Sequence, residues 1–371
     1  MKAAVLETVG QPLKIYHDVV INDPRDGEVL VQIKNCGVCH SDLNVVNGSF
    51  PAFGTVILGH EASGIVEKIG AGVTHVKPGD HVVLTIAPPC GQCYFCLRND
   101  FSLCQNNTGM QLFALADGTH ALSRNGEKIY HGFGMAAFAE KVVLPARAAI
   151  KIDKDIPFEL ACLAGCALQT GVGAVLNTAK VEQGATVLIM GLGGVGMSAV
   201  QGAKIAGASI ILVSDPVAER REMAMKLGAT HAINPLEATA HGNIVEKTCR
   251  KLTNKIGMDY AFETAGIAKL LEIGINCIRP GGLTVAVGAP PLDQGITINP
   301  VTLFGSMEKK LCGCMLGSCN SLTDIPRLLQ FWREGKLDLQ SMITAIRPLE
   351  GINEAFDDMK AGRGIRTVLK I

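Results

Sequence analysis

Short apolar runs alternate with helix-length segments in the second half of the chain. Thr186–Met190 reads "TVLIM", Ile210–Ser214 reads "IILVS", and the segments "HAINP", "MDYAFETAG" and "GGLTVAVGAP" follow. Apolar runs of this length, separated by helix-length segments, are typical of strands buried on both faces of a parallel sheet. The pattern predicts a doubly wound α/β domain in this part of the chain.

The first half of the chain has a different pattern. Between residues 28 and 80, apolar and polar positions alternate in "EVLVQIK" and "SGIVEKIG", and glycine or proline interrupts them, as in "KPGDHVV". Alternation with a period of two predicts strands that are buried on one face. Because the chain has 371 residues and 48% hydrophobic content, it can bury two cores, and we expect two domains.

Charge and hydropathy narrow the class of protein. Thirty-four basic and 34 acidic residues give a formal net charge of zero, and no long run of Lys or Arg is present, so we expect no nucleic-acid partner.

Residues 183–203 contain no charged side chain, which could suggest a membrane span. The six glycines in this segment favour a strand, a turn and the start of a helix instead. The start "MKAAVLETVG" reaches Glu7 after four apolar residues, too few for a signal peptide. We expect an untargeted, cytoplasmic protein with no membrane partner.

A glycine turn follows the first of the parallel strands. In "GLGGVG", Gly191 suits the tight turn, Gly193 the approach of a pyrophosphate and Gly196 the contact of helix with strand. Asp215 ends the next strand, where this fold places the acid that binds the adenosine ribose and repels a 2′-phosphate. Each feature alone also fits an ordinary turn or a solvated acid. Together they predict NAD rather than NADP.

Four cysteines lie close together in "PPCGQCYFCLRNDFSLC", at Cys90, Cys93, Cys96 and Cys104. A reducing cytosol and an odd total of 13 cysteines disfavour disulfides, so a metal site is the preferred interpretation. A ferredoxin-type cluster would need a shorter last gap followed by proline, whereas Gln105 follows here. Zinc is therefore favoured, with an iron–sulfur cluster as the lesser alternative.

Three more potential metal ligands lie far apart in the sequence. Cys39 occurs in "NCGVCHSD", His60 in "LGHEASG" and Cys166 in "CLAGCALQTG". Two thiolates and an imidazole suit a catalytic zinc that keeps one position open for water or substrate. Taken singly, each would be interpreted as a buried thiol or a core histidine.

The ordered motifs "CGVCHSD", "GHE", "PCGQCYFC" to "FSLC", "GCALQTG", "GLGGVG" and "GIRTVLKI" resemble those of the zinc-dependent medium-chain alcohol dehydrogenases. The likeness extends from the first strand to the last residue. It implies a β-rich, GroES-like catalytic domain of residues 1–167, to which residues 313–371 return, and a Rossmann NAD-binding domain of residues 168–312. It also implies NAD, two zinc ions per chain, hydride transfer between an alcohol and NAD, and a homodimer formed near residues 303–314.

The resemblance assigns roles around the two zinc ions. The catalytic zinc ligands would be Cys39, His60 and Cys166, and the structural zinc ligands would be Cys90, Cys93, Cys96 and Cys104. Glu61 would be an acid that can visit the metal, Asp42 would orient His60, and Ser41 would accept the hydroxyl proton. Asn44 stands where many relatives end the proton relay in a histidine, so the relay must end differently here.

The resemblance also implies a set of cofactor contacts. The residues are His40, Thr170, Gly191, Gly193, Gly194, Val195, Gly196, Asp215, Arg220, Val287 and Arg366. His40 replaces an arginine that holds the pyrophosphate in many relatives, so we expect a weaker, pH-dependent grip on NAD. Val287 could equally be an ordinary core valine, and Arg220 could be a solvated residue on a helix. Cys36, Cys162, Cys312, Cys314 and Cys319 are interpreted as small packed residues without chemistry.

The substrate pocket implied by the resemblance is apolar, with Phe50, Ile86 and Phe133. Thr108 occupies the position where relatives that oxidise the glutathione adduct of formaldehyde carry a cation. We therefore expect hydrophobic primary alcohols, such as medium-chain, allylic or benzylic ones. A polyol dehydrogenase of the same superfamily is the nearer alternative, and a non-enzymatic dinucleotide-binding protein is the more distant one.

Overall fold

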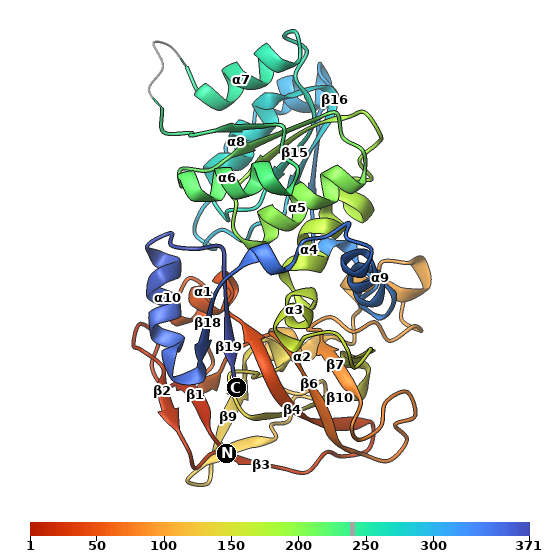
Figure 1. The fold of residues 1–371 in the computed structure, drawn as a ribbon, viewed down its shortest axis with the longest axis vertical. Helices are drawn as coiled ribbons and strands as arrows, with labels where there is room; N and C mark the ends of the chain where they lie inside the picture. The colour runs from red at the N-terminus through yellow and green to blue at the C-terminus, as the bar shows by residue number, and fades with distance from the viewer. Residues whose placement is uncertain (238–241) are drawn as a thin grey trace. The chain divides into compact units, whose positions relative to one another are not determined.

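The computed structural model describes residues 1–237 and 242–371. Internal contacts divide the described chain into two compact units, drawn as a ribbon in Figure 1. The first unit comprises Met1–Ala167, Asn320–Gly335 and Ile343–Ile371, and the second comprises Leu168–Cys319 and Lys336–Met342. This division rests on contacts within the chain alone. The limits of the catalytic domain (1–167 with 313–371) and of the NAD-binding domain (168–312) that the sequence led us to expect stay a prediction.

The first unit contains two sheets, in which most neighbouring strands are antiparallel. Within the described residues, one sheet has the order β2-β1-β5-β9-β8-β3 and the other has the order β11-β7-β6-β4-β19-β18, with β10 also paired to β4. The first sheet consists of β1 (Ala3–Leu6), β2 (Lys14–Tyr16), β3 (Val20–Ile21), β5 (Val56–Ile57), β8 (Leu122–Arg124) and β9 (Glu127–His131). The second consists of β4 (Glu28–Gly37), β6 (Glu61–Ile69), β7 (His81–Leu84), β10 (Lys141–Pro145), β11 (Ala149–Ile152), β18 (Ile343–Pro348) and β19 (Arg366–Lys370).

Strand β4 is more buried than its alternating sequence predicts. Val31 and Ile33 face the main core of the first unit, as expected. On the opposite face, Leu30 packs with Leu115 and Val143 in a smaller apolar cluster. The expectation of one solvated face was wrong here, because the segment around Leu115 covers that side of the strand.

The second unit contains a parallel sheet with the order β14-β13-β12-β15-β16-β17 in the described part of the chain. Its strands are β12 (Thr186–Met190), β13 (Ile210–Ser214), β14 (His231–Ile233), β15 (Met258–Glu263), β16 (Ile278–Ala286) and β17 (Lys310–Gly313). Met190 is in register with Ser214 and with Glu263, so the carboxyl ends of three strands meet at one edge. The predicted doubly wound sheet is confirmed, and this edge is where such sheets bind ligands.

Helices cover both faces of the parallel sheet. They are α5 (Gly194–Ile205), α6 (Ala218–Leu227), α7 (Ile244–Leu252) and α8 (Ala268–Cys277). Leu188 and Met190 pack in one apolar cluster with Val245 of α7 and Cys277 of α8. Because side chains alternate along a strand, Val187 and Ile189 face the other side, where α5 packs on β12 and α6 packs beside α5. Figure 1 shows α5 and α6 on one side of the strands and α8 on the other.

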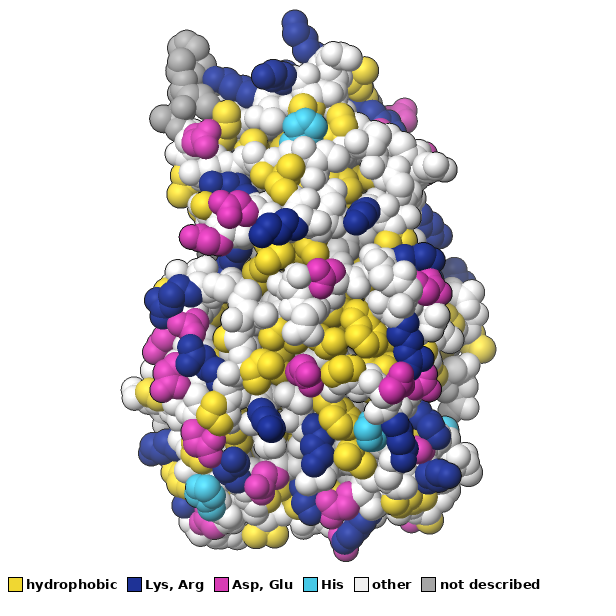
Figure 2. Space-filling model, viewed as in Figure 1, with side chains coloured by type: hydrophobic (Ala, Val, Ile, Leu, Met, Phe, Trp, Pro, Cys, Tyr) yellow, Lys and Arg dark blue, Asp and Glu magenta, His cyan; other side chains and the backbone are white. Residues whose placement is uncertain are grey.

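The remaining α-helices are short or lie late in the chain. They are α1 (His40–Val46), α2 (Thr108–Leu112), α3 (Phe158–Ala161), α4 (Ala167–Gly173), α9 (Ser321–Arg333) and α10 (Ile352–Lys360). No single helix in the described ranges is long and apolar enough to cross a membrane; one bent pair, Phe158–Gly165 with Ala167–Thr178, passes by length and composition only. Most residues of that pair are buried in the protein. On the face seen in Figure 2, basic and acidic side chains are interspersed.

Candidate functional site

Three potential metal ligands come together in the first unit. Cys39 directly precedes α1, His60 directly precedes β6, and Cys166 lies between the 3₁₀ turn Cys162–Gly165 and α4. The ligand atoms of these residues all lie within 4.8 Å of one another. All three side chains are buried, with at most 7% of their surface exposed. Two soft thiols and one imidazole at this separation form a donor set that suits zinc.

The protonation of these residues also fits a bound cation. The pKa of Cys39 lies well below its ordinary value, chiefly because the Cys166 thiol hydrogen-bonds to its sulfur, and despite burial, which acts in the opposite direction. Burial lowers the pKa of His60, but Asp42 raises it well above the ordinary value. Donor atoms that share protons in this way can exchange those protons for a divalent ion.

Asp42 orients the imidazole of His60. Its Oδ1 lies 3.1 Å from His60 Nδ1 and also accepts a hydrogen bond of 3.0 Å from the backbone N–H of Gly59. A carboxylate at Nδ1 stabilises the tautomer in which Nδ1 carries the hydrogen and Nε2 keeps its lone pair. The arrangement leaves Nε2 free to ligate a metal.

Glu61 and Arg366 form a buried ion pair beside this cluster. Glu61 Oε1 accepts a hydrogen bond of 2.8 Å from the Ala167 N–H and lies 3.4 Å from Arg366 Nη2. Burial raises the pKa of Glu61 to about 7, while Arg366 opposes that shift. A Cβ atom at Gly37 would lie 2.2 Å from Glu61 Oε2, so only glycine leaves room for this carboxylate. Arg366 Nη1 also donates to Val38 O at 2.9 Å. The phosphate contact expected for Arg366 stays a prediction.

Helix α1 carries the residues expected to handle the proton. Ser41 Oγ lies 3.8 Å from Cys39 Sγ, so the hydroxyl is adjacent to a ligand sulfur. His40, the first residue of the helix, is exposed. Asn44 is half-buried, and its carbonyl accepts a hydrogen bond of 2.8 Å from the Phe50 N–H. The helix therefore places one hydroxyl at the cluster, and the titratable His40 side chain is open to solvent.

The second group of potential ligands comprises Cys90, Cys93, Cys96 and Cys104, whose sulfurs lie within 4.8 Å of one another. The Cys90–Cys96 and Cys93–Cys104 sulfur pairs are 4.0 and 3.9 Å apart. Zinc–sulfur bonds of about 2.3 Å in a tetrahedron require sulfur separations of about 3.8 Å, so the four thiols match a closed zinc site. All 13 cysteines are free, in line with the expectation that the cluster is not a disulfide knot.

The glycine turn in the second unit fits a dinucleotide. Gly191 has φ of +94°, which favours glycine, and a Cβ at Gly196 would lie 1.9 Å from the Gly191 carbonyl oxygen. A Cβ at Gly193 would meet no atom within 4 Å, so the space beside this residue is open. Gly193 caps α5 without a side-chain hydrogen bond, which leaves backbone N–H groups of the first turn for an anion. Gly194 and Val195 are the first two residues of α5.

Asp215 is held next to this turn. Its Oδ2 accepts a hydrogen bond of 2.7 Å from the Leu192 N–H and its Oδ1 one of 2.8 Å from the Val217 N–H. The residue is 4% exposed, and each carboxylate oxygen keeps a lone pair for a ligand hydroxyl. Arg220 lies five residues further on, in α6, and is half-buried.

Two other residues expected to contact the cofactor lie on elements of the same unit. Thr170 lies in α4, which packs tightly against α5: a Cβ at Gly171 would lie 2.2 Å from the Val195 carbonyl oxygen. Val287 follows β16, and its N–H donates to the Glu263 carbonyl at 2.9 Å.

The buried Glu263 side chain accepts hydrogen bonds from the backbone N–H groups of Ala265 and Ile267. Glu263 therefore anchors two loops at the carboxyl edge of the sheet, a role that sequence reasoning missed.

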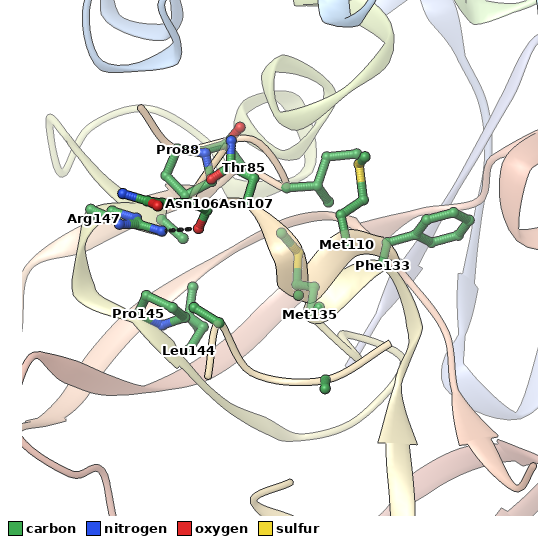
Figure 3. Close-up of a pocket in the computed structure, with 16 residues that line it drawn as sticks. Thr85, Pro88, Asn106, Asn107, Met110, Phe133, Met135, Leu144, Pro145 and Arg147 are labelled. Carbon is green, nitrogen blue, oxygen red and sulfur yellow. Dashed lines mark hydrogen bonds between the residues drawn. The ribbon is translucent and has the colours of Figure 1, made fainter. Parts of the chain in front are cut away.

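Aromatic packing beside His60 is a second feature that sequence reasoning did not predict. The Phe133 ring contacts the His60 ring edge to face, with centroids 4.8 Å apart, and the centroids of the Phe113 and Phe133 rings are 5.2 Å apart. Ile86 and Phe133 line a common cavity, shown in Figure 3, whereas Phe50 is half-buried against the main core. The wall next to the metal cluster is therefore aromatic.

Comparison with known proteins gives matches along nearly the whole chain. The family described as "Alcohol dehydrogenase GroES-like domain" matches residues 25–154, and the family described as "Zinc-binding dehydrogenase" matches residues 194–334. "Alcohol dehydrogenase class-3" of Cereibacter sphaeroides is 38% identical over 374 residues, or 99% of each chain. "S-(hydroxymethyl)glutathione dehydrogenase" of Paracoccus denitrificans is 37% identical over 99% of each chain. The crystal structure of benzyl alcohol dehydrogenase from Acinetobacter calcoaceticus has a TM-score of 0.92 and 33% identity, over 100% of this chain and 99% of that one.

Proposed function

Because the chain belongs to the zinc-dependent medium-chain alcohol dehydrogenases, we propose that it interconverts hydrophobic primary alcohols and aldehydes. Membership makes it an NAD-dependent oxidoreductase of small-molecule substrates that uses zinc. The observation that carries the choice of hydrophobic alcohols is the Phe133 ring, which packs on His60 and gives the metal cluster an apolar neighbour. The name of the Acinetobacter relative, which acts on benzyl alcohol, supports the same choice.

We assign a different role to each of the two groups of potential metal ligands. Cys39, His60 and Cys166 would hold the catalytic zinc, and Cys90, Cys93, Cys96 and Cys104 would hold the structural one. When bound, the catalytic zinc supplies a Lewis acid that makes a hydroxyl group more acidic, and NAD supplies a hydride acceptor. Asp42 keeps the His60 imidazole in the tautomer that ligates. Ser41, adjacent to Cys39, takes up the hydroxyl proton.

The onward path of that proton is also specific to this chain. Asn44 cannot titrate, so it cannot serve as the final acceptor. His40 is exposed at the start of α1, one residue before Ser41. We assign the release of the proton to solvent at this end of the helix.

Efficiency with straight-chain primary alcohols is expected to rise with length, from ethanol to about hexanol. Each buried CH₂ contributes about 0.8 kcal/mol, which corresponds to about a fourfold increase in kcat/KM per carbon until the pocket is full. Steady-state kinetics with the zinc-loaded enzyme and NAD would measure this. The name of the Paracoccus relative makes the glutathione adduct of formaldehyde the second candidate, and sorbitol tests the polyol alternative. A flat series, or the highest efficiency with either of these compounds, would contradict the proposal.

We also propose that two copies associate through the edge of the parallel sheet. β17 is an edge strand within the described residues, and Val301, Phe304 and Met307 expose apolar side chains just before it. A second β17 would satisfy unpaired backbone groups and cover these side chains. Sedimentation at micromolar concentration should give a dimer, and replacing Phe304 with Glu should shift it toward the monomer. A monomeric wild-type protein would contradict this interface.

A further inference from the structure

A buried carboxylate lies at the carboxyl edge of the parallel sheet in the second unit. Glu263 is the last residue of β15, which pairs with β12 and with β16, and its side chain is fully buried. Its Oε1 accepts hydrogen bonds of 2.8 and 3.2 Å from the N–H groups of Ala265 and Ile267. Its Oε2 is shielded from solvent and has no hydrogen-bond partner among the residues that the structure describes. Only one of the two oxygens is therefore used to hold the loop that follows β15.

The loop after the neighbouring strand packs directly on this carboxylate. The N–H groups of Val287 and Gly288 donate to the Glu263 backbone carbonyl at 2.9 and 2.8 Å. A Cβ atom at Gly288 would lie 2.5 Å from Glu263 Oε2, so a larger residue there would displace either the carboxylate or the loop. β15 and β16 are adjacent in Figure 1. The backbone that carries Val287 is therefore held in contact with the residue that carries the negative charge.

The charge of Glu263 has no cationic partner within residues 1–237 and 242–371. Burial raises the pKa of its carboxyl, although the N–H groups of Ala265, Gly266 and Ile267 oppose that shift. A raised pKa means that the ionised form lacks favourable partners, which a positive charge nearby would supply. A neutral glutamine amide would also provide the oxygen that holds the loop, so the loop contacts do not require the charge.

The strand order indicates which part of the coenzyme this carboxylate faces. A sheet of this order binds a dinucleotide across the point where the order reverses, which lies between β12 and β15. The adenosine half is assigned to the glycine turn after β12 and to Asp215, so the nicotinamide half falls to the ends of β15, β16 and β17. The nicotinamide ring is positively charged in NAD and neutral in NADH. A buried carboxylate at these strand ends therefore attracts one form of the coenzyme and not the other.

We propose that the Glu263 carboxylate makes the coenzyme site selective for oxidised NAD over NADH by its charge. Glu263 is a positioning residue, because it acts through the Val287 loop and through its electric field. The inference goes beyond the proposed function, since it depends on NAD as coenzyme and not on which alcohol is oxidised. Weaker retention of NADH favours its release after alcohol oxidation.

The test is the affinity of Glu263→Gln for three ligands, measured with the zinc-loaded enzyme in the absence of alcohol. Fluorescence titration gives the Kd of NADH, and displacement of NADH gives the Kd values of NAD and of ADP-ribose, which lacks the nicotinamide. The Kd of NAD should rise about tenfold, the effect of one charge at about 10 Å in a medium of effective dielectric constant about 20. The Kd values of NADH and ADP-ribose should change by no more than about twofold, because neither carries the positive ring.

Asp259→Asn is the matched control, because Asp259 lies near the other end of β15 and pairs with Arg279. Its ratio of NAD to NADH affinity should equal that of the wild type. Should Glu263→Gln not fold, Glu263→Asp and Glu263→Asn give the same comparison, since they are equal in size and differ in charge. The ratio should then differ about tenfold between these two variants.

Two results would overturn the inference. One is an unchanged ratio of NAD to NADH affinity, either in Glu263→Gln or between the Asp and Asn variants. The other is an equal loss of affinity for NAD, NADH and ADP-ribose, which would leave Glu263 with a structural role alone. Alcohol oxidation by the wild-type enzyme tests the proposed function separately, and melting temperature shows whether each variant is folded.

Discussion

Replacing Cys166 with serine is expected to lower kcat/KM for any alcohol by at least about 10⁴-fold while NAD binding persists. The serine hydroxyl is a poor ligand for zinc, and losing a Lewis acid removes several kcal/mol of transition-state stabilisation. The glycine turn and Asp215 lie in the second unit, whereas all three ligands lie in the first, so the two functions separate. Steady-state kinetics and fluorescence titration with NADH would measure both effects.

The control for this prediction is Cys104→Ser, which removes one ligand of the other cluster. Each variant should contain one zinc per chain where the wild type contains two, as measured by elemental analysis. Cys104→Ser should lower the melting temperature but keep most of the activity of the folded fraction, because its site is closed. If Cys166→Ser failed to fold while Cys104→Ser lost only activity, the roles of the two sites would have to be exchanged.

Replacing Asp215 with glycine is expected to shift the preference from NAD toward NADP by about 100-fold. The carboxylate is fixed by the Leu192 and Val217 N–H groups, so it presents a rigid acceptor and a full charge at the end of β13. Removing it deletes charge-assisted hydrogen bonds to the ribose, worth about 1.5–3 kcal/mol, and the repulsion of a 2′-phosphate. The ratio of kcat/KM values for the two coenzymes with one alcohol measures the shift.

Two further variants show whether the shift is specific. Asp215→Asn keeps an acceptor for one of the two backbone N–H groups but removes the charge, so it should reproduce part of the shift with less loss of stability than Asp215→Gly. Asp259→Asn is the matched control, because Asp259 binds Thr186 and Arg279 at the start of β15. It should leave the coenzyme ratio unchanged. An unchanged ratio in Asp215→Gly would mean that this acid does not face the ribose.

Local sequence patterns were sufficient to predict two strands and the glycine turn of the second unit. β12 and β13 have the bounds that their apolar runs predict, because strands buried on both faces consist of uninterrupted apolar residues. The turn at Gly191 was equally predictable, because its positive φ and the close approach of Gly196 to its carbonyl oxygen admit little but glycine. In both cases the structural requirement acts on residues that are close in the sequence, so a short stretch of sequence shows it.

The features that escaped prediction depend on residues far apart in the chain. Leu30 is buried on the face expected to be solvated because the segment around Leu115 covers it. Phe133 packs on His60, which lies 73 residues earlier in the chain, and nothing in the segment "HGFGMAAFA" marks that contact. Tertiary contacts of this kind have no period and no motif. The four clustered cysteines were identified as metal ligands from their spacing, whereas the assignment of Cys39, His60 and Cys166 to one site depended on a known family that orders its motifs in the same way.

The pairing of β19 with β4 sets an order of events during synthesis on the ribosome. β4 emerges early, but the strand that hydrogen-bonds to its Asn35–Gly37 end is β19, and Val38 and Arg366 are 328 residues apart. The parallel sheet is contiguous in the chain, so it can fold before that partner exists. Until β19 arrives, the Asn35–Gly37 end of β4 lacks a partner strand on that edge, although β10 already pairs with Glu28–Gln32, and Glu61 lacks its guanidinium partner. The part of the molecule that is translated first is therefore among the last to be completed. The backbone groups at the Asn35–Gly37 end of β4 stay without their partner strand until the end of synthesis.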